Sequence, residues 1–359
     1  MSSNLHRIQE RLTENGPAAL LITEISNVQW ASGFTGSSGF VLVAPKRALF
    51  ISDSRYAVQA KEEVRDMDVS IYSSPTDAAS FIGAEAKRLG MTELGFEADH
   101  VTFSQYERWK TKLAPSTLVP ITDFIEPLRM IKTPDEIARI RRACELADAC
   151  FAHVVRMIQP GVRELDISLD IEFFFRRQGA NLAFEPIVVS GERSARPHGR
   201  ASEKKLEKGD FLTMDFGAKL DGYNSDITRT VVVQEASDRH RQVYAQVLKA
   251  QIASIEALKS GVSASSVDGL SRKILAERDL DQYFGHGLGH GLGQLVHDFG
   301  RLNATSKDMI APGQVWTIEP GVYIEGFGGV RIEDDVVVTE KGNEVLTHSP
   351  KELLVLPMA

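Results

Sequence analysis

The sequence has little cysteine, no long apolar run and no basic tract, and each absence argues against a class of protein. Its two cysteines, Cys144 and Cys150, are too widely spaced on one expected helix to form a disulfide, so both are expected to be small buried residues. The longest apolar runs, such as residues 18–22, span about five residues, whereas a membrane-spanning helix needs about 20. A net charge of −8 argues against nucleic acid or an anionic membrane as the main partner. Scarce cysteine and the lack of a hydrophobic leader favour the cytoplasm.

The length of 359 residues is sufficient for two domains with separate cores. Residues 1–126 alternate short apolar stretches with helical patterns, which predicts an α/β domain with a mixed sheet. A new helix begins after the junction, with Thr133 as its N-cap and Glu136 completing a capping box. Residues 127–359 are expected to form an α+β domain in which helices precede and separate strand-rich, glycine-rich segments.

The stretch from residue 213 to residue 233 predicts a β-hairpin with acidic residues on one face. Asp215 occupies a position where a core-facing strand should carry an apolar side chain, and Asp226 lies on the return strand. Because a buried lone carboxylate is costly, the pair suggests a bound cation or an arginine partner. A solvated edge hairpin remains an alternative on this stretch alone.

Three further residues favour the cation. His290 lies in a glycine ladder, Glu319 follows an apolar strand, and Glu333 precedes another. With the hairpin they offer four carboxylates and one imidazole, an oxygen-rich set for two divalent ions. Paired ions of this kind serve hydrolysis, among others in aminopeptidases.

The order and spacing of these five residues resemble the pita-bread metallopeptidases, most closely the proline-specific branch of Xaa-Pro dipeptidase (prolidase) and aminopeptidase P. The segments WASGFTGSSGF and ISDSRYAVQA are similar to the N-terminal domain of the same enzymes. The resemblance implies an α/β N-terminal domain of the creatinase/prolidase type, which shapes the substrate cleft and builds a homodimer. It also implies a pita-bread catalytic domain with two divalent ions. Mn²⁺ is favoured on ligand hardness, with Co²⁺ and Zn²⁺ as alternatives.

The resemblance also implies residue roles. Asp215 holds one ion, His290 and Glu319 hold the other, and Asp226 and Glu333 bridge them. Glu319 additionally carries a proton to the leaving proline nitrogen.

Three further histidines are interpreted in the same way. His297 would bind the scissile carbonyl, and His198 would lie near the proline ring or its carboxylate. His286 competes with His290 as a ligand, but only His290 gives the family spacing to Glu319.

Three further positions are interpreted from their surroundings in the sequence. Arg331 shares a strand face with Glu333, so it either orients a ligand carboxylate or contacts substrate. Asp335 is expected to cap or pair locally. Prolidases commonly read GLEVHE after the histidine ladder, whereas this chain reads GQLVHD and has Leu295 at the acidic position.

Several alternatives remain open. Dipeptidase activity is slightly favoured over aminopeptidase activity, and a non-catalytic pita-bread binding protein is a remote third, because such proteins lack several of the five ligands. In the N-terminal domain, Trp30 and Phe34 precede the glycine-serine run at 36–39, and Arg55 and Tyr56 add a cationic and an aromatic group in the same domain. This loop is either a solvated turn or a cover for an active site in a second copy of the chain.

Overall fold

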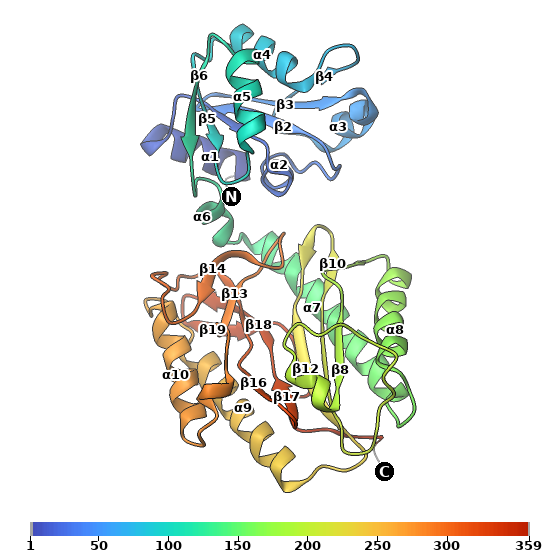
Figure 1. Ribbon diagram of the computed structural model, residues 1–359. Coiled ribbons are helices and arrows are strands. Elements are labelled where there is room, and N and C mark those ends of the chain that lie inside the picture. Colours follow the sequence, from blue (N-terminus) through green and yellow to red (C-terminus); the bar gives the residue numbers. More distant parts are fainter. Residues whose placement is uncertain (1–2, 358–359) are drawn as a thin grey trace. The chain divides into compact units, whose positions relative to one another are not determined.

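The computed structural model describes residues 3–357, and its contacts divide the chain into two compact units, one ending at Arg129 and the other beginning at Met130 (Figure 1). The sequence analysis places this boundary after residue 126. Within the described residues, every helix is too short or too polar to cross a bilayer.

The first unit is built on a six-stranded mixed sheet of order β4-β3-β2-β1-β5-β6. Pairing is antiparallel for β1–β2 and β2–β3 and parallel for the other neighbours. The strands are β1 (Leu20–Ile22), β2 (Phe40–Ala44), β3 (Arg47–Asp53), β4 (Asp68–Tyr72), β5 (Glu93–Glu97) and β6 (Thr117–Ile121). The helices are α1 (Asn4–Asn15), α2 (Ile25–Ser32), η1 (Ser54–Tyr56), α3 (Ala57–Glu63), α4 (Ala78–Arg88), α5 (Phe103–Lys112) and α6 (Glu126–Met130), the last of which crosses the boundary.

The aromatic residues beside the glycine-serine run belong to the core of this unit. Trp30 and Phe34 are buried, and the Phe34 ring packs against Phe50 at 4.7 Å and Tyr56 at 5.5 Å. Both rings therefore contribute to the apolar core of this unit. The Arg55 side chain near the loop is exposed and pairs with Asp53.

The second unit places two pairs of helices outside strongly curved sheets (Figure 1). Its longest sheets have the orders β20-β12-β9-β8 and β14-β13-β15-β18-β19. The helices are α7 (Pro134–Val154), η2 (Val155–Met157), α8 (Glu164–Arg177), η3 (Gly191–Ala195), α9 (Asp238–Ala257), α10 (Ala264–Ala276) and η4 (Asp281–Tyr283). The strands of these two sheets are β8 (Ile187–Ser190), β9 (Phe211–Phe216), β12 (Ile227–Val233), β13 (Gly289–Gly291), β14 (Asp298–Leu302), β15 (Val315–Ile318), β18 (Asp334–Thr339), β19 (Gly342–Val345) and β20 (Val355–Leu356). Short sheets are formed by β7 (Asn181–Leu182), β10 (Ala218–Leu220) and β11 (Tyr223–Asn224), and by β16 (Gly321–Ile324) and β17 (Gly328–Arg331).

Each helix pair covers one sheet through its own apolar cluster. On one side, Phe151 of α7 and Ile171 of α8 belong to the cluster that contains Met214 of β9. On the other side, Val247 of α9 and Leu275 of α10 belong to the cluster of Trp316 and its neighbours. Helix α7 begins with the predicted capping box: Thr133 Oγ1 accepts from the Glu136 backbone N–H, and the Glu136 side chain accepts from the Thr133 N–H.

Candidate active site

The acidic hairpin is buried in the second unit. Strands β9 and β12 pair antiparallel, with Asp215 opposite Thr228. Asp215 Oδ2 accepts a hydrogen bond from Arg331 Nη2 at 2.6 Å, and the Asp226 backbone N–H donates to Asp335 Oδ2 at 2.8 Å. Both aspartates are buried, which removes the alternative of a solvated edge hairpin.

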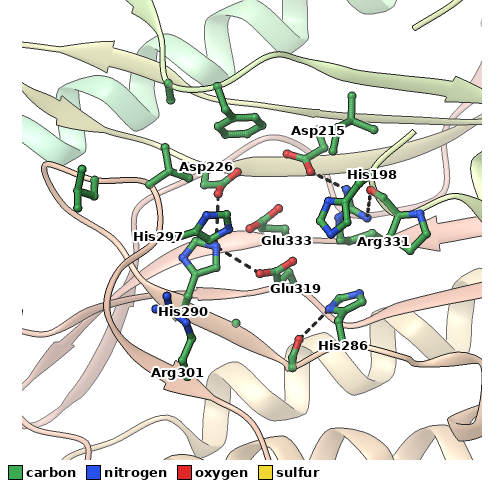
Figure 2. A pocket seen from close by; sticks show the side chains of 18 of the residues that line it. His198, Asp215, Asp226, His286, His290, His297, Arg301, Glu319, Arg331 and Glu333 are labelled. Carbon is green, nitrogen blue, oxygen red and sulfur yellow. Dashed lines mark hydrogen bonds and ion pairs between the residues drawn. The ribbon is translucent and has the colours of Figure 1, made fainter. Parts of the chain in front are cut away.

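Three other segments bring their side chains to the same point (Figure 2). His290 on β13 places Nε2 3.7 Å from Asp226 Oδ2 and 3.5 Å from Glu319 Oε1. Possible ligand atoms of Asp226, His290 and Glu333 all lie within 4.8 Å of one another. Residues far apart in the sequence thus converge on one buried spot.

Glycines in the histidine ladder allow this convergence. A Cβ on Gly289 would lie 2.0 Å from the Thr317 carbonyl oxygen, and one on Gly291 would lie 2.0 Å from the carbonyl oxygen of Phe299. Strand β13 can therefore lie between β14 and β15 only with glycine on both sides of His290. Thr317 then orients two of the polar residues, since its hydroxyl accepts from the His290 N–H at 3.0 Å and donates to Glu319 at 3.2 Å.

Burial sets the charge state of the cluster. Desolvation, reinforced by the surrounding carboxylates, raises the pKa of Asp226 and of Glu333 well above the usual range. Burial also raises the pKa of Glu319 to about 8 and lowers that of His290 to about 3. In the metal-free cluster, burial therefore favours the protonated form of Asp226, Glu319 and Glu333 and keeps His290 neutral.

The donor set fits a divalent cation. Within the described residues, Asp215 Oδ1 and Asp226 Oδ1 are buried and have no hydrogen-bond partner, a costly arrangement unless a cation supplies one. His290 Nδ1 lies 3.0 Å from the Gly291 carbonyl oxygen, so Nδ1 carries the proton and Nε2 presents its lone pair to the carboxylates. A neutral imidazole with a fixed tautomer among carboxylates is a suitable ligand set.

We expect bound metal to stabilise the protein more as the pH rises. Carboxyl groups with raised pKa values make the metal-free native state bind more protons than the unfolded chain, so its free energy of unfolding falls as pH rises from the ordinary 4.5 of a Glu toward about 8. Divalent ions remove this penalty. The difference in melting temperature between metal-loaded and chelated protein should widen from about pH 5 to about pH 8. A difference that stays constant across that range would contradict the assigned charge states.

Arg331, which donates to Asp215, is also hydrogen-bonded to Tyr323. Arg331 Nη1 donates to the Tyr323 hydroxyl at 2.6 Å, and its Nε donates to Thr228 Oγ1 at 3.0 Å. His286 Nδ1 lies 2.8 Å from the Gly287 carbonyl oxygen and its Nε2 lies 2.9 Å from the Tyr323 hydroxyl. Both nitrogens of His286 are thus occupied away from the carboxylates, and burial lowers its pKa to about 4. Tyr323 was missed in the sequence, where nothing distinguishes it from a core residue.

The prediction of a local partner for Asp335 is wrong. Its Oδ2 accepts from the Asp226 N–H and from the Cys144 thiol of α7 at 3.2 Å, both distant in sequence. Asp335 sits on β18, and its side chain reaches across to the start of β12 and to the helix behind it. Cys144 is a small buried residue as expected, and burial raises the pKa of its thiol.

A cavity of about 750 Å³ opens onto the carboxylates. Its lining contains every site residue that the sequence suggested: His198, Asp215, Asp226, His290, His297, Glu319, Arg331 and Glu333. His286 and Leu295 also line it, and Leu295 remains 40% exposed. The His297 ring lies 4.3 Å from that of His290.

Two lining residues, Phe184 and Arg301, were missed in the sequence. Arg301 Nη1 donates to the carbonyl oxygens of Asp298 and Gly300, both at 2.7 Å. Its positive charge, after burial, helps to lower the pKa of His297. Arg301 lies opposite His290 in the β13–β14 pairing, which an irregularity interrupts, so no regular alternation in the sequence marks it.

The fold and the site together define a two-domain metallopeptidase. Residues 4–131 match the creatinase/prolidase N-terminal domain, and residues 138–340 match metallopeptidase family M24. The chain belongs to metallopeptidase family M24, and its use of divalent metal agrees with the buried cluster. The expected fold class, an α/β N-terminal domain followed by an α+β pita-bread catalytic domain, is confirmed.

The relatives that follow are similar to this chain over nearly its whole length. It is 37% identical to the Xaa-Pro dipeptidase of Pyrococcus furiosus over 99% of this chain and 100% of the relative. The solved structure of an Xaa-Pro dipeptidase from Bacillus anthracis matches with a TM-score of 0.95 and 42% identity, covering 98% of this chain and 99% of that one. The X-Pro aminopeptidase from Thermotoga maritima matches with a TM-score of 0.90 and 36% identity, covering 97% and 99%.

Proposed function

We propose that the protein is an Xaa-Pro dipeptidase, which hydrolyses the bond before proline in two-residue peptides. The observation that carries this proposal is Arg301 in the same cavity as His198 and His297. A guanidinium at the wall of a peptide site pairs well with a carboxylate. In a dipeptide the proline itself carries that carboxylate, so a pairing with Arg301 would favour the shortest substrate. The names of the P. furiosus and B. anthracis relatives support the same activity.

The metal site is proposed to hold two divalent ions. Asp215 would bind one, His290 and Glu319 the other, and Asp226 and Glu333 would bridge. Mn²⁺ is our first choice, with Co²⁺ or Zn²⁺ as alternatives. When bound, such a pair lowers the pKa of water and polarises a carbonyl group.

The remaining site residues would bind the substrate and move protons. Glu319, whose carboxyl group retains a proton in the metal-free site, is the proposed group that takes a proton from water and delivers it to the proline nitrogen. His297, kept neutral by burial, would donate to the scissile carbonyl oxygen. His198 would contact the proline ring or its carboxylate. Arg331 would hold Asp215 in place, a role that its 2.6 Å contact favours over direct substrate binding.

For the N-terminal domain we propose the roles that the resemblance implies, a part in the substrate cleft and in a homodimer. The candidate metal ligands among the described residues all lie outside it. We also propose a cytoplasmic enzyme, because both Cys144 and Cys150 are free thiols.

Activity against peptides of increasing length tests the substrate. We expect an Xaa-Pro dipeptide to be cleaved with a higher kcat/KM than Xaa-Pro-Xaa and longer peptides. The replacement Arg301→Gln should raise KM for the dipeptide about 10- to 100-fold, the scale of one lost charged hydrogen bond. The increase in KM for longer peptides should be smaller. Faster cleavage of longer peptides by the unmodified enzyme would instead support an Xaa-Pro aminopeptidase, the activity named for the T. maritima structure.

A further inference from the structure

The segment from Gly293 to Asp298, which we call the His297 loop, is held from one side by strand β11. The His297 loop connects β13 to β14, and its residues Leu295 and His297 line the cavity. The Asn224 backbone N–H donates to the Gly293 carbonyl oxygen at 2.9 Å. The Asn224 side-chain amide donates to the carbonyl oxygens of Gly293 and Gln294 at 3.0 and 2.9 Å. The first half of the loop is thereby tied to the strand that leads into Asp226.

A buried ion pair closes the loop from the other side. Lys132 lies just before α7, and its side chain is 1% exposed. Its Nζ is 4.0 Å from Asp298 Oδ2, and the Asp298 side chain is 3% exposed. The Lys132 backbone is itself fixed, since its N–H donates to the Gly313 carbonyl oxygen at 2.8 Å.

The two ends of the loop meet at this pair. A Cβ on Gly293 would lie 2.4 Å from Asp298 Oδ2 and 3.1 Å from Lys132 Cε. Glycine at 293 therefore lets the first residue of the loop approach the side chain of its last residue, with the lysine against both. Asp298 is also the direct neighbour of His297, so anchoring its side chain restricts the backbone next to the histidine.

We propose that Lys132 and Asp298 are positioning residues for His297, and that their ion pair closes the loop and keeps the imidazole at its place in the cavity. This inference rests on the substrate-binding role proposed above for His297. Burying two charges is unfavourable for stability alone, because desolvation offsets much of their attraction. Fixing the register of a segment is the better-attested use of such a pair, and this pair joins the two ends of the segment that carries His297.

The test uses Lys132→Met combined with Asp298→Asn, which removes both charges and leaves neither buried alone. We expect kcat/KM to fall about 10²-fold, the scale of a 1 Å displacement, with metal content unchanged. The same pair of changes is then made in a His297→Ala background. If the ion pair acts through His297, the further loss there should stay within about twofold. An equal 10²-fold loss in that background would assign the pair a purely structural role and overturn the proposal.

A readout independent of substrate separates this inference from the proposed function. Amide hydrogen exchange should accelerate in residues 293–298 of the double variant and remain unchanged in β15. Unchanged exchange in the loop overturns the inference whatever peptide the enzyme cleaves. If the unmodified enzyme cleaves no Xaa-Pro peptide but the loop does loosen, the substrate proposal fails and the structural role of the pair stands. Lys249→Met, which removes an exposed pair with Glu277 between α9 and α10, is the control and should change neither readout.

Discussion

Asp226→Asn is expected to abolish both metal binding and turnover. Asp226 is a buried member of the ligand cluster, and its Oδ1 has no hydrogen-bond partner within the described residues. An amide keeps the size of the side chain but removes the negative charge proposed to bridge two cations. The loss of kcat should exceed the ~10²–10³-fold that one oxyanion donor is worth, because the nucleophile itself would no longer be generated.

The stability of this variant separates loss of metal from loss of fold. Burial raises the pKa of Asp226 and so favours its protonated form in metal-free protein, and asparagine resembles that form. Chelated Asp226→Asn should therefore melt no lower than chelated parent protein. Asp221→Asn is a matched control, because Asp221 lies on the exposed turn between β10 and β11 at a φ of 49°, which asparagine tolerates. Full metal content in Asp226→Asn, measured by elemental analysis, would refute the assignment of this residue.

His297→Ala is expected to lower kcat about 10²-fold or more while metal remains bound. The imidazole lines the cavity beside His290 but is not a member of the buried ligand cluster. Because burial lowers its pKa, it is a neutral donor at neutral pH and can serve a developing oxyanion. His297→Gln should recover part of the loss, since an amide N–H can replace the ring donor.

Steady-state kinetics and metal analysis on the same preparations check this prediction. The control is His153→Ala, which removes a partly exposed histidine on α7 that pairs with Asp170. Unchanged turnover of an Xaa-Pro dipeptide by His297→Ala would show that the ring does not contact the reacting carbonyl. Loss of metal together with turnover would instead assign His297 to the metal site.

The buried cluster of carboxylates and His290 could be predicted from sequence because each member breaks a local pattern. Asp215 stands at a buried strand position, and His290 stands between glycines that close strand packing requires. A charge in such a context signals a ligand or a partner. The outer residues give no such signal. Arg301 and Lys132 are ordinary cations in the sequence, and only the folded chain brings them to the cavity and to Asp298.

Helix α2 illustrates the corresponding limit for the fold. The sequence analysis missed it because its eight residues lack a solvent-facing polar stripe: Ser26 and Asn27 are buried along with Val28 and Trp30. Its polar groups are satisfied over long distances, as when Asn27 Nδ2 donates to Glu97 and Glu126 at 2.7 and 2.8 Å. Partners so far apart in the chain cannot be read from a local pattern. The longer helices α7 to α10, with caps and apolar faces, could be predicted.

The most direct test of a metal-dependent Xaa-Pro peptidase is a titration of metal-free protein with Mn²⁺, in which bound metal and proline released from an Xaa-Pro dipeptide are measured together. We expect no release without metal, and a rise to full activity as two ions bind per chain. Undiminished release from protein shown to be free of metal would contradict the proposed chemistry. Saturated metal binding without release of proline from any Xaa-Pro peptide would contradict the proposed substrate.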